Sequence, residues 1–157
     1  MNLEQELKSE LVTHLDLTDF SMADQETAVG DVISQMRSER NNVCLIVDAD
    51  RKLVGIFSDR DVMRKVAGNP GMLTQPIHTV MTAQPITITP DTSAAEALWL
   101  MDEKGVRNLP VVRADGTVIG ELAYQAFINY LAARYPIEVL NRPPRPTQFP
   151  RRQEGGD

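Results

Sequence analysis

The sequence has few of the residues that support disulfides, metal sites and membrane spans. Its 157 residues include one cysteine and two histidines. Cys44 therefore cannot form an internal disulfide, and its apolar surroundings, VCLIV, predict a buried and unreactive side chain. No apolar run approaches the roughly 18 residues that a membrane span needs, and the polar start MNLEQELKSELV is unlike a signal peptide. We expect a protein of the cytoplasm with no membrane partner.

The net charge and the lack of catalytic motifs argue against several classes of protein. The formal net charge of −6 argues against a surface built to follow nucleic-acid backbones. His14 and His78 are far apart in the sequence, and no His/Cys cluster has the spacing of a metal site. No hydroxyl or thiol lies beside a base in a recognisable nucleophile motif. We therefore expect neither an enzyme nor a metalloprotein.

One unit of sequence occurs twice. Shifting the chain by 65 residues aligns residues 27–63 with residues 92–128 without a gap. Between the identities, the match rests on pairs of apolar residues such as Ile33 with Leu98 and Val54 with Ile119. Identical pairs include Thr27 with Thr92, Met36 with Met101, Asp50 with Asp115, and Gly55 with Gly120.

Each copy predicts the order β-α-β-β-α. A short apolar segment (DFSM, PITI) precedes a helix, which has apolar residues at helical spacing. A strand (VCLIV, LPVV), a turn (DADRK, RADGT) and a second strand (LVGIF, VIGEL) then predict a hairpin, and DRDVMRKV or YQAFINYL predicts a closing helix. Neither copy is long enough to cover both faces of its own sheet. We predict an α/β (α+β) fold in which the two repeats pack together with pseudo-two-fold symmetry.

This order and its motifs resemble the cystathionine β-synthase (CBS) domain, which occurs in tandem pairs called Bateman modules. The passages LIVDADRKLVGIFSDRDVMRKV and VMTAQPITITPDTSAAEALWLMDEKGVRNLPVVRADGTVIG carry the resemblance. It covers residues 18–131. The expected organisation is an N-terminal helix (1–17), a first repeat (18–70), a linker (71–84), a second repeat (85–133) and a Pro/Arg-rich tail (134–157).

Ser58 and Asp61 lie three residues apart where a predicted strand gives way to a helix. The free amides at a helix start attract phosphate, a serine hydroxyl can bind phosphate or ribose, and an ionised carboxylate suits a ribose diol. Arg60 is the neighbouring cation best placed to reach a phosphate. The alternative is structural: Ser58 caps the helix, and Asp59 and Asp61 are acids favoured in its first turn.

The resemblance favours the ligand interpretation. In the family, glycine, two apolar residues, serine or threonine, two variable residues and aspartate mark sites for AMP, ADP, ATP or S-adenosylmethionine, and Gly55, Ser58 and Asp61 match this pattern. The resemblance also implies base contacts from the other repeat. Carried over to this sequence, these contacts fall on Thr89, Ala94, Val106, Arg107, Asn108 and Pro110. Arg107 matches a position that faces phosphate in relatives, where it can serve the cleft of its own repeat; the alternative is a solvated arginine at the rim.

The second copy departs from the pattern. Ala123 and Ala126 replace the serine and aspartate, and Glu121 follows the glycine, where an acid would repel phosphate. We therefore expect one competent cleft per chain. The first copy has NNV where many nucleotide-binding relatives have His or Arg, which favours monophosphate or nucleoside ligands over ATP. AMP or ADP is the ligand we expect.

The segments before and after the two repeats suggest contacts with another subunit or another protein. Leu3, Leu7, Leu11 and Leu15 form an apolar stripe on the predicted N-terminal helix, which would cover its own module or, in a homodimer, a second subunit. The tail NRPPRPTQFPRRQEGGD favours an extended or disordered segment, either solvated or docking on a partner.

Two function classes remain. One is a regulatory sensor that binds an adenosine-containing ligand and signals to a partner protein, and the other is a dimeric scaffold with a vestigial cleft. A DNA-binding regulator is disfavoured, because the sequence has neither a recognisable helix-turn-helix segment nor a basic face beyond the tail.

Overall fold

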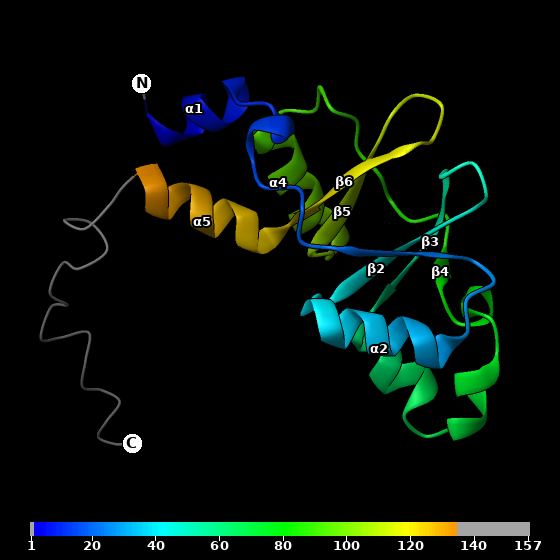
Figure 1. Ribbon diagram of the computed structural model, residues 1–157. Helices are drawn as coiled ribbons and strands as arrows, with labels where there is room; N and C mark the ends of the chain where they lie inside the picture. Colours follow the sequence, from blue (N-terminus) through cyan, green and yellow to red (C-terminus); the bar gives the residue numbers. More distant parts are fainter. Residues whose placement is uncertain (1, 135–157) are drawn as a thin grey trace, which may run out of the picture. The chain divides into compact units, whose positions relative to one another are not determined.

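A computed structural model describes residues 2–134 of the chain, shown in Figure 1. It divides into two units, residues 1–126 and residues 127–157, and each is described by itself. In the second unit, the Arg134 guanidinium carbon lies 5.4 Å from the centroid of the Tyr130 ring. The elements are α1 (Leu3–Ser9), β1 (Ser21–Asp24), α2 (Val29–Glu39), β2 (Val43–Val47), β3 (Leu53–Ser58), α3 (Asp59–Asp61), β4 (Thr82–Ala83), α4 (Ala94–Lys104), β5 (Asn108–Val112), β6 (Val118–Ala123) and α5 (Tyr124–Arg134).

The strands form two sheets in the first unit. One has the order β1-β2-β3-β4, in which β1 and β2 are parallel and the other pairs are antiparallel. The other is the antiparallel pair of β5 and β6. The mixed α+β fold is confirmed. The expected strand PITI is reduced to a single parallel bridge between Ile88 and Val111.

The 65-residue repeat is visible in the backbone. Arg40 ends α2 with a φ of 61°, and Gly105 ends α4 with a φ of 66°. Both hairpins have a register shift at equivalent positions, between Ile46 and Val47 and between Val111 and Val112. The two copies therefore share their helix ends and strand irregularities as well as their apolar pattern.

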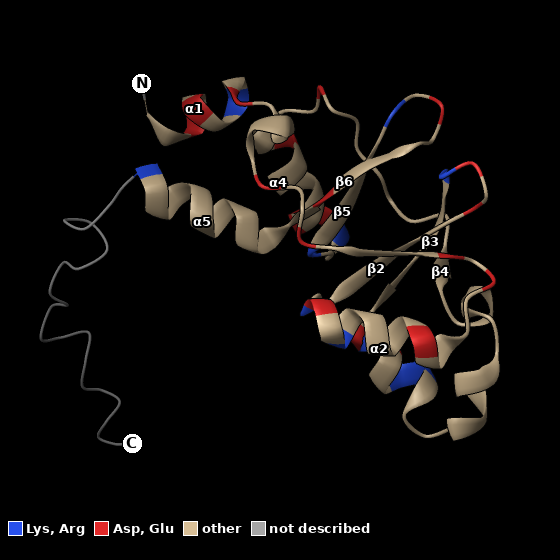
Figure 2. Cartoon of the chain, viewed as in Figure 1, with Lys and Arg blue, Asp and Glu red and all other residues tan. Residues whose placement is uncertain are grey.

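Both hairpin turns are built around an aspartate. Asp48 Oδ1 accepts hydrogen bonds from the backbone N–H groups of Asp50 (2.9 Å) and Lys52 (3.0 Å), and Asp115 Oδ1 accepts one from Thr117 (2.9 Å). Aspartate favours tight turns because its side chain can bond to backbone groups two residues further on. Both turns carry charges of both signs (Figure 2).

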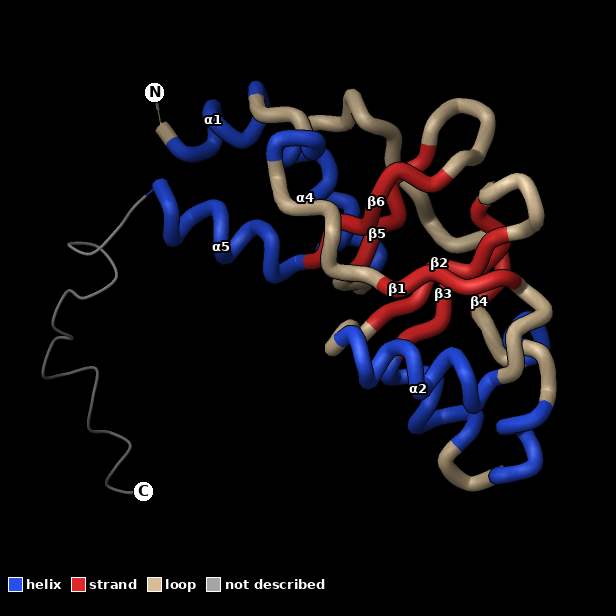
Figure 3. Tube along the Cα trace, in the orientation of Figure 1, coloured by secondary structure: helices blue, strands red, loops and turns tan. Residues whose placement is uncertain are grey.

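Helices and sheets pack through two apolar clusters. In the first, Val29, Val32 and Met36 of α2 are buried against strand residues that include Ile46 and Phe57, which confirms the predicted helix stripe. The second joins the two sheets, which lie next to each other in Figure 3. It contains Val43, Leu45 and Val47 of β2 together with Val112 of β5 and Val118 of β6. Packing of β2 against β5 and β6 therefore fixes one repeat on the other.

The helix that closes the first repeat is irregular. The segment DRDVMRKV was expected to form an α-helix, but only α3 is α-helical and Val62–Val66 forms a π-helical turn. The Ala67 N–H donates to the Val62 carbonyl, five residues back, at 2.9 Å. Lys65 Nζ also donates to the carbonyl of Val80 at 2.8 Å, so the wider turn is held to the following segment. Single π-helical turns are frequent at functional sites.

The expected N-terminal helix over residues 1–17 is wrong in extent. Helix α1 ends at Ser9, and a short 3₁₀ turn follows at Val12–His14. The intervening backbone pairs with the start of α4, since the Ala94 N–H donates to Glu10 (2.7 Å) and the Val12 N–H donates to Thr92 (2.9 Å). These bonds replace helical ones, so the apolar stripe is divided: Leu3 and Leu7 line a cavity with α4, and Leu11 pairs with Ser93 at the start of α4.

Cys44 is fully buried, as predicted. Burial, together with the charge of Glu39, raises the pKa of its thiol to about 12, which disfavours the reactive thiolate. The Pro/Arg-rich tail lies outside the described residues. None of the helices in residues 2–134 has the length and apolar character needed to cross a bilayer.

Glu121 is a buried acid in the second repeat. It pairs with Pro110 across the hairpin, its relative exposure is 0%, and neither carboxyl oxygen has a hydrogen-bond partner among the described residues. Burial raises the pKa of this carboxyl well above its ordinary value of 4.5, because the charged form loses its hydration. The sequence interpretation of Glu121 as an acid facing phosphate is therefore corrected: the side chain is enclosed and favours the neutral form.

We predict that Gly120→Ala destabilises the fold by about 1–3 kcal/mol. A Cβ atom at position 120 would lie 2.7 Å from Leu17 Cβ and 2.8 Å from the Leu17 carbonyl oxygen, and this backbone cannot move aside cheaply. At the equivalent Gly55 a Cβ would meet only the flexible Met81 side chain, so Gly55→Ala should cost less. Urea unfolding measures both, with Gly68→Ala as the control because a Cβ there meets nothing within 4 Å. Equal costs at 55 and 120 would contradict the prediction.

We predict that the free energy of unfolding falls as the pH rises above 4.5, the ordinary pKa of the Glu121 carboxyl. Below that pH the carboxyl is protonated in both states, whereas above it only the unfolded state ionises until the raised folded pKa is reached. Glu121→Ile, which copies the equivalent Ile56, should remove this slope and add about 1–3 kcal/mol at pH 7.5. Chemical denaturation from pH 4 to 9 tests this. The control Glu103→Gln changes an exposed acid and should leave the slope in place.

Candidate functional site

A cleft of about 440 Å³ lies where the first repeat, the linker and the second repeat meet. Ligand pockets for small molecules span about 300–1,000 Å³. Six of the nine residues expected to bind a ligand line it: Ser58, Arg60, Asp61, Val106, Arg107 and Asn108. The repeats therefore bring together residues almost 50 positions apart in the sequence.

Asp61 is held rigidly at the wall of this cleft. Its Oδ2 accepts hydrogen bonds from the Ser58 N–H at 2.9 Å and from the Ser58 hydroxyl at 3.3 Å. Its Oδ1 lies 3.3 Å from Lys65 Nζ. The residue is only 9% exposed, so its orientation is set by these partners. Oδ2 already accepts two hydrogen bonds, whereas the Lys65 ammonium is the one printed partner of Oδ1, so Oδ1 keeps capacity for a ligand hydroxyl group.

This geometry also bears on the structural alternative. Asp61 does cap the start of α3, because it receives the N–H of Ser58. Such a cap contributes about 0.5–2 kcal/mol to stability. Capping and ligand binding use different lone pairs of the same carboxylate and are therefore compatible.

Cations outnumber acids around the cleft. Arg60, Arg64 and Arg107 line it together with Asp59 and Asp61. The three guanidinium groups supply donors in the planar arrangement that suits phosphate. Among residues 2–134 there is no group of three or more His, Cys, Asp or Glu residues suited to a metal ion.

Three expected site residues lie elsewhere. Thr89 is exposed and bonds through its hydroxyl to Asp91 and Thr92. Ala94 is fully buried, because the segment after α1 pairs with the start of α4. Pro110 is buried in β5, and its carbonyl accepts the Ile88 N–H at 3.0 Å. The structure does not bring these residues to the cleft.

The end of the linker and the start of the second repeat contribute residues that the sequence interpretation missed. Thr82, Gln84, Pro85 and Ile86 line the cleft together with Ile56 of β3. Thr82 pairs with Ile56 because β4 adds to the edge of the first sheet. In the segment TAQPI, the proline between polar and apolar residues was one sequence feature that could have drawn attention to this region. The strand β4 within it is only two residues long, which is too short to be predicted from the sequence. The segment reaches the cleft because β4 pairs with β3, which is distant in the sequence.

The equivalent region of the second repeat lacks these features. Ala123 and Ala126 occupy the positions of Ser58 and Asp61, and Glu121 occupies that of Ile56. The Glu121 N–H donates to the Leu17 carbonyl at 3.0 Å, so the chain before β1 runs along the edge of β6. This region therefore offers neither the anchored carboxylate nor the hydroxyl of the first repeat.

Comparison with known protein families gives two matches. The family described as CBS domain matches residues 12–68 and residues 77–133. A CBS domain-containing protein of Arabidopsis thaliana, CBSCBSPB5, is 36% identical over 97 residues, which is 61% of this chain and 18% of that protein. An uncharacterised protein of Methanopyrus kandleri is 33% identical over 118 residues, 73% of this chain and 60% of that protein. The chain thus spans only part of the length of these curated relatives.

Solved structures share the fold. CBSX2 in complex with AMP has a TM-score of 0.71 and 22% identity, over 82% of this chain and 100% of that chain. A CBS domain pair in complex with 5′-methylthioadenosine and S-adenosyl-L-methionine has a TM-score of 0.68 and 23% identity, over 77% of this chain and 98% of that chain. With two matched segments and the repeated architecture described above, this chain belongs to the CBS domain family and contains a tandem pair of CBS domains.

Proposed function

We propose that the chain is a non-catalytic regulatory module that binds an adenosine-containing ligand in this cleft. AMP or ADP is the favoured ligand, and one cleft per chain is competent. A bound ligand changes how the module, as a homodimer, acts on a partner protein.

The observation that carries this proposal is the anchored carboxylate of Asp61 beside three arginines. Ser58 and Lys65 fix the carboxylate, so it can accept ribose hydroxyls without losing further side-chain freedom. Arg60, Arg64 and Arg107 supply donors for a phosphate. Ile56, Pro85 and Ile86 supply apolar surface for a base. The cleft therefore offers a carboxylate for the sugar, guanidinium groups for the phosphate and apolar side chains for the base.

The related complexes support this ligand class. CBSX2 binds AMP, and the other CBS pair binds 5′-methylthioadenosine and S-adenosyl-L-methionine. Adenosine is the part that these ligands share. Selection among AMP, ADP and ATP would rest on the arginines of this chain.

We predict that AMP raises the thermal stability of the wild-type protein and that Asp61→Asn weakens AMP binding at least tenfold. At 100 times its dissociation constant, AMP should stabilise the fold by about 2.7 kcal/mol. The asparagine oxygen still accepts the Ser58 N–H, but the charge and one acceptor are lost, and hydrogen bonds to charged groups contribute about 1.5–3 kcal/mol. Thermal shift and calorimetry with AMP, ADP, ATP, adenosine and S-adenosylmethionine measure this.

The matched control is Asp59→Asn. Asp59 also lines the cleft, but it is exposed, so its replacement should change AMP affinity less than threefold. Unchanged AMP affinity in Asp61→Asn would reject the assigned site. Failure of every adenosine compound to bind the wild type would reject the sensor function.

A dimeric scaffold is the second candidate, and an exposed aromatic residue on α4 favours it. Trp99 is 59% exposed, and large exposed apolar groups often mark protein–protein contacts. The expected result is that Trp99→Glu shifts a dimer to monomers in sedimentation velocity. The control Glu103→Gln, on the same helix, should leave the sedimentation coefficient unchanged. A wild type that is monomeric at 100 µM, about the highest useful concentration, would contradict the scaffold.

A further inference from the structure

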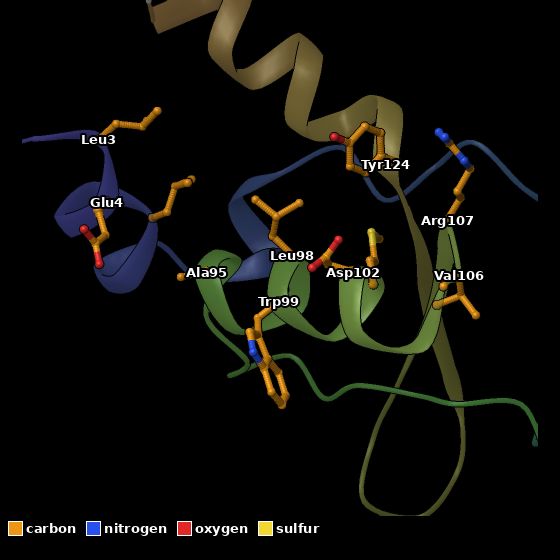
Figure 4. A pocket seen from close by; sticks show the side chains of 12 residues that line it. Leu3, Glu4, Ala95, Leu98, Trp99, Asp102, Val106, Arg107 and Tyr124 are labelled. Atoms are coloured by element: carbon orange, nitrogen blue, oxygen red, sulfur yellow. The ribbon is translucent and has the colours of Figure 1, made fainter.

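One short segment, Gly105–Arg107, lines two different cavities. One is the cleft that holds Asp61. The other is a cavity of about 820 Å³ between α1 and α4, shown in Figure 4, whose walls include Leu3, Leu98 and Trp99. All of these residues belong to the first unit. The segment is therefore a shared wall, and its side chains can respond to both cavities.

Arg107 is held at this wall by Tyr124. The guanidinium carbon lies 5.3 Å from the centroid of the Tyr124 ring, within the range of a cation–π interaction. The backbones are also joined, because the Tyr124 N–H donates to the Arg107 carbonyl at 2.9 Å. Figure 4 shows both side chains at the edge of the second cavity. Two independent contacts therefore fix Arg107 relative to Tyr124.

Stacking leaves the donors of Arg107 available. A guanidinium interacts with an aromatic ring through its face, whereas its N–H groups point outward in the plane. Among the described residues, no carboxylate forms an ion pair with Arg107. Its N–H groups can therefore bind an anion in the cleft while the guanidinium stays over the ring.

We propose that Tyr124 is a positioning residue for the cleft: it holds Arg107 ready for a ligand phosphate, and the Arg107–Tyr124 pair transmits phosphate binding to the cavity between α1 and α4. This proposal rests on the proposed function and names how the same site is regulated. Tyr124 does not line the cleft, so it would not touch the ligand. It lines the second cavity together with Arg107.

The second cavity contains a tryptophan whose fluorescence can report changes there. Trp99 is the single tryptophan of the chain and lines this cavity. A phosphate that restrains Arg107 also restrains Tyr124, and both side chains line the same cavity as Trp99. Adenosine, which has no phosphate, would fill the cleft without this effect. By thermodynamic reciprocity, a change at the second cavity must in turn alter phosphate affinity.

The experiment compares AMP with adenosine in Tyr124→Leu and in the matched control Tyr124→Phe. Tyr124→Leu removes the aromatic face, so AMP affinity measured by calorimetry should fall about two- to fivefold. Adenosine affinity should stay unchanged in the same variant. Tyr124→Phe keeps the face and should bind both ligands as the wild type does. In an Arg107→Gln background, Tyr124→Leu should have no further effect on AMP.

Trp99 emission is the second measurement, taken at one protein concentration so that association is constant. AMP should shift the emission of the wild type with the same half-saturation as calorimetry, and adenosine should not. The shift should be lost in Tyr124→Leu and Arg107→Gln and kept in Tyr124→Phe.

Each outcome decides between the proposals. Equal weakening of AMP and adenosine by Tyr124→Leu would make Tyr124 a merely structural residue, and unchanged affinity for both would reject the pair as a positioning device. AMP binding without any change in Trp99 emission would overturn the transmission while leaving the proposed function intact. If the wild type binds neither AMP nor adenosine, the proposed function itself fails, and the role of Tyr124 fails with it.

Discussion

The packing of β2 against β5 and β6 is the contact on which the rest of this structure depends. Val43, Leu45 and Val47 meet Val112 and Val118, and these five side chains are almost completely withdrawn from water. Neither sheet could bury this apolar face alone, so the two repeats are held together by the hydrophobic effect. The same contact brings the α3 junction of the first repeat next to Val106, Arg107 and Asn108 of the second. Without it, no cleft would form.

The two repeats have diverged at the positions that matter for a ligand. In the first, Asp61 is fixed by Ser58 and Lys65 and faces the cleft. In the second, the equivalent position is Ala126, and the acid at Glu121 is enclosed without a partner among the described residues. A buried neutral carboxyl gives nothing to a phosphate site and reduces stability. Similar backbones therefore carry unequal chemistry, which is the physical basis for proposing one competent cleft.

The two cavities of the first unit give the proposed sensor a physical connection. They share the segment Gly105–Arg107, which follows the left-handed end of α4. The cation–π pair of Arg107 and Tyr124 spans the distance from the cleft to the cavity between α1 and α4. In the proposed transmission, phosphate binding in the cleft restrains the Arg107 side chain, and no larger change of the backbone is required. Trp99 of α4 lines the same cavity and is 59% exposed.

The sequence by itself determined the repeat, the helix and hairpin at the centre of each copy, the buried helix stripe and the junction of Ser58 with Asp61. These features are local, because periodicity and helix capping depend on residues within a few positions of one another. The tertiary structure decided which residues of the other repeat reach the cleft. It replaced Thr89, Ala94 and Pro110 by Thr82, Gln84, Pro85 and Ile86, which lie where the linker meets the second repeat. It also ended α1 early and buried Glu121. Each of these outcomes depends on backbone pairing or packing between segments that are distant in the sequence. The free energy of such contacts cannot be read from the pattern of neighbouring residues.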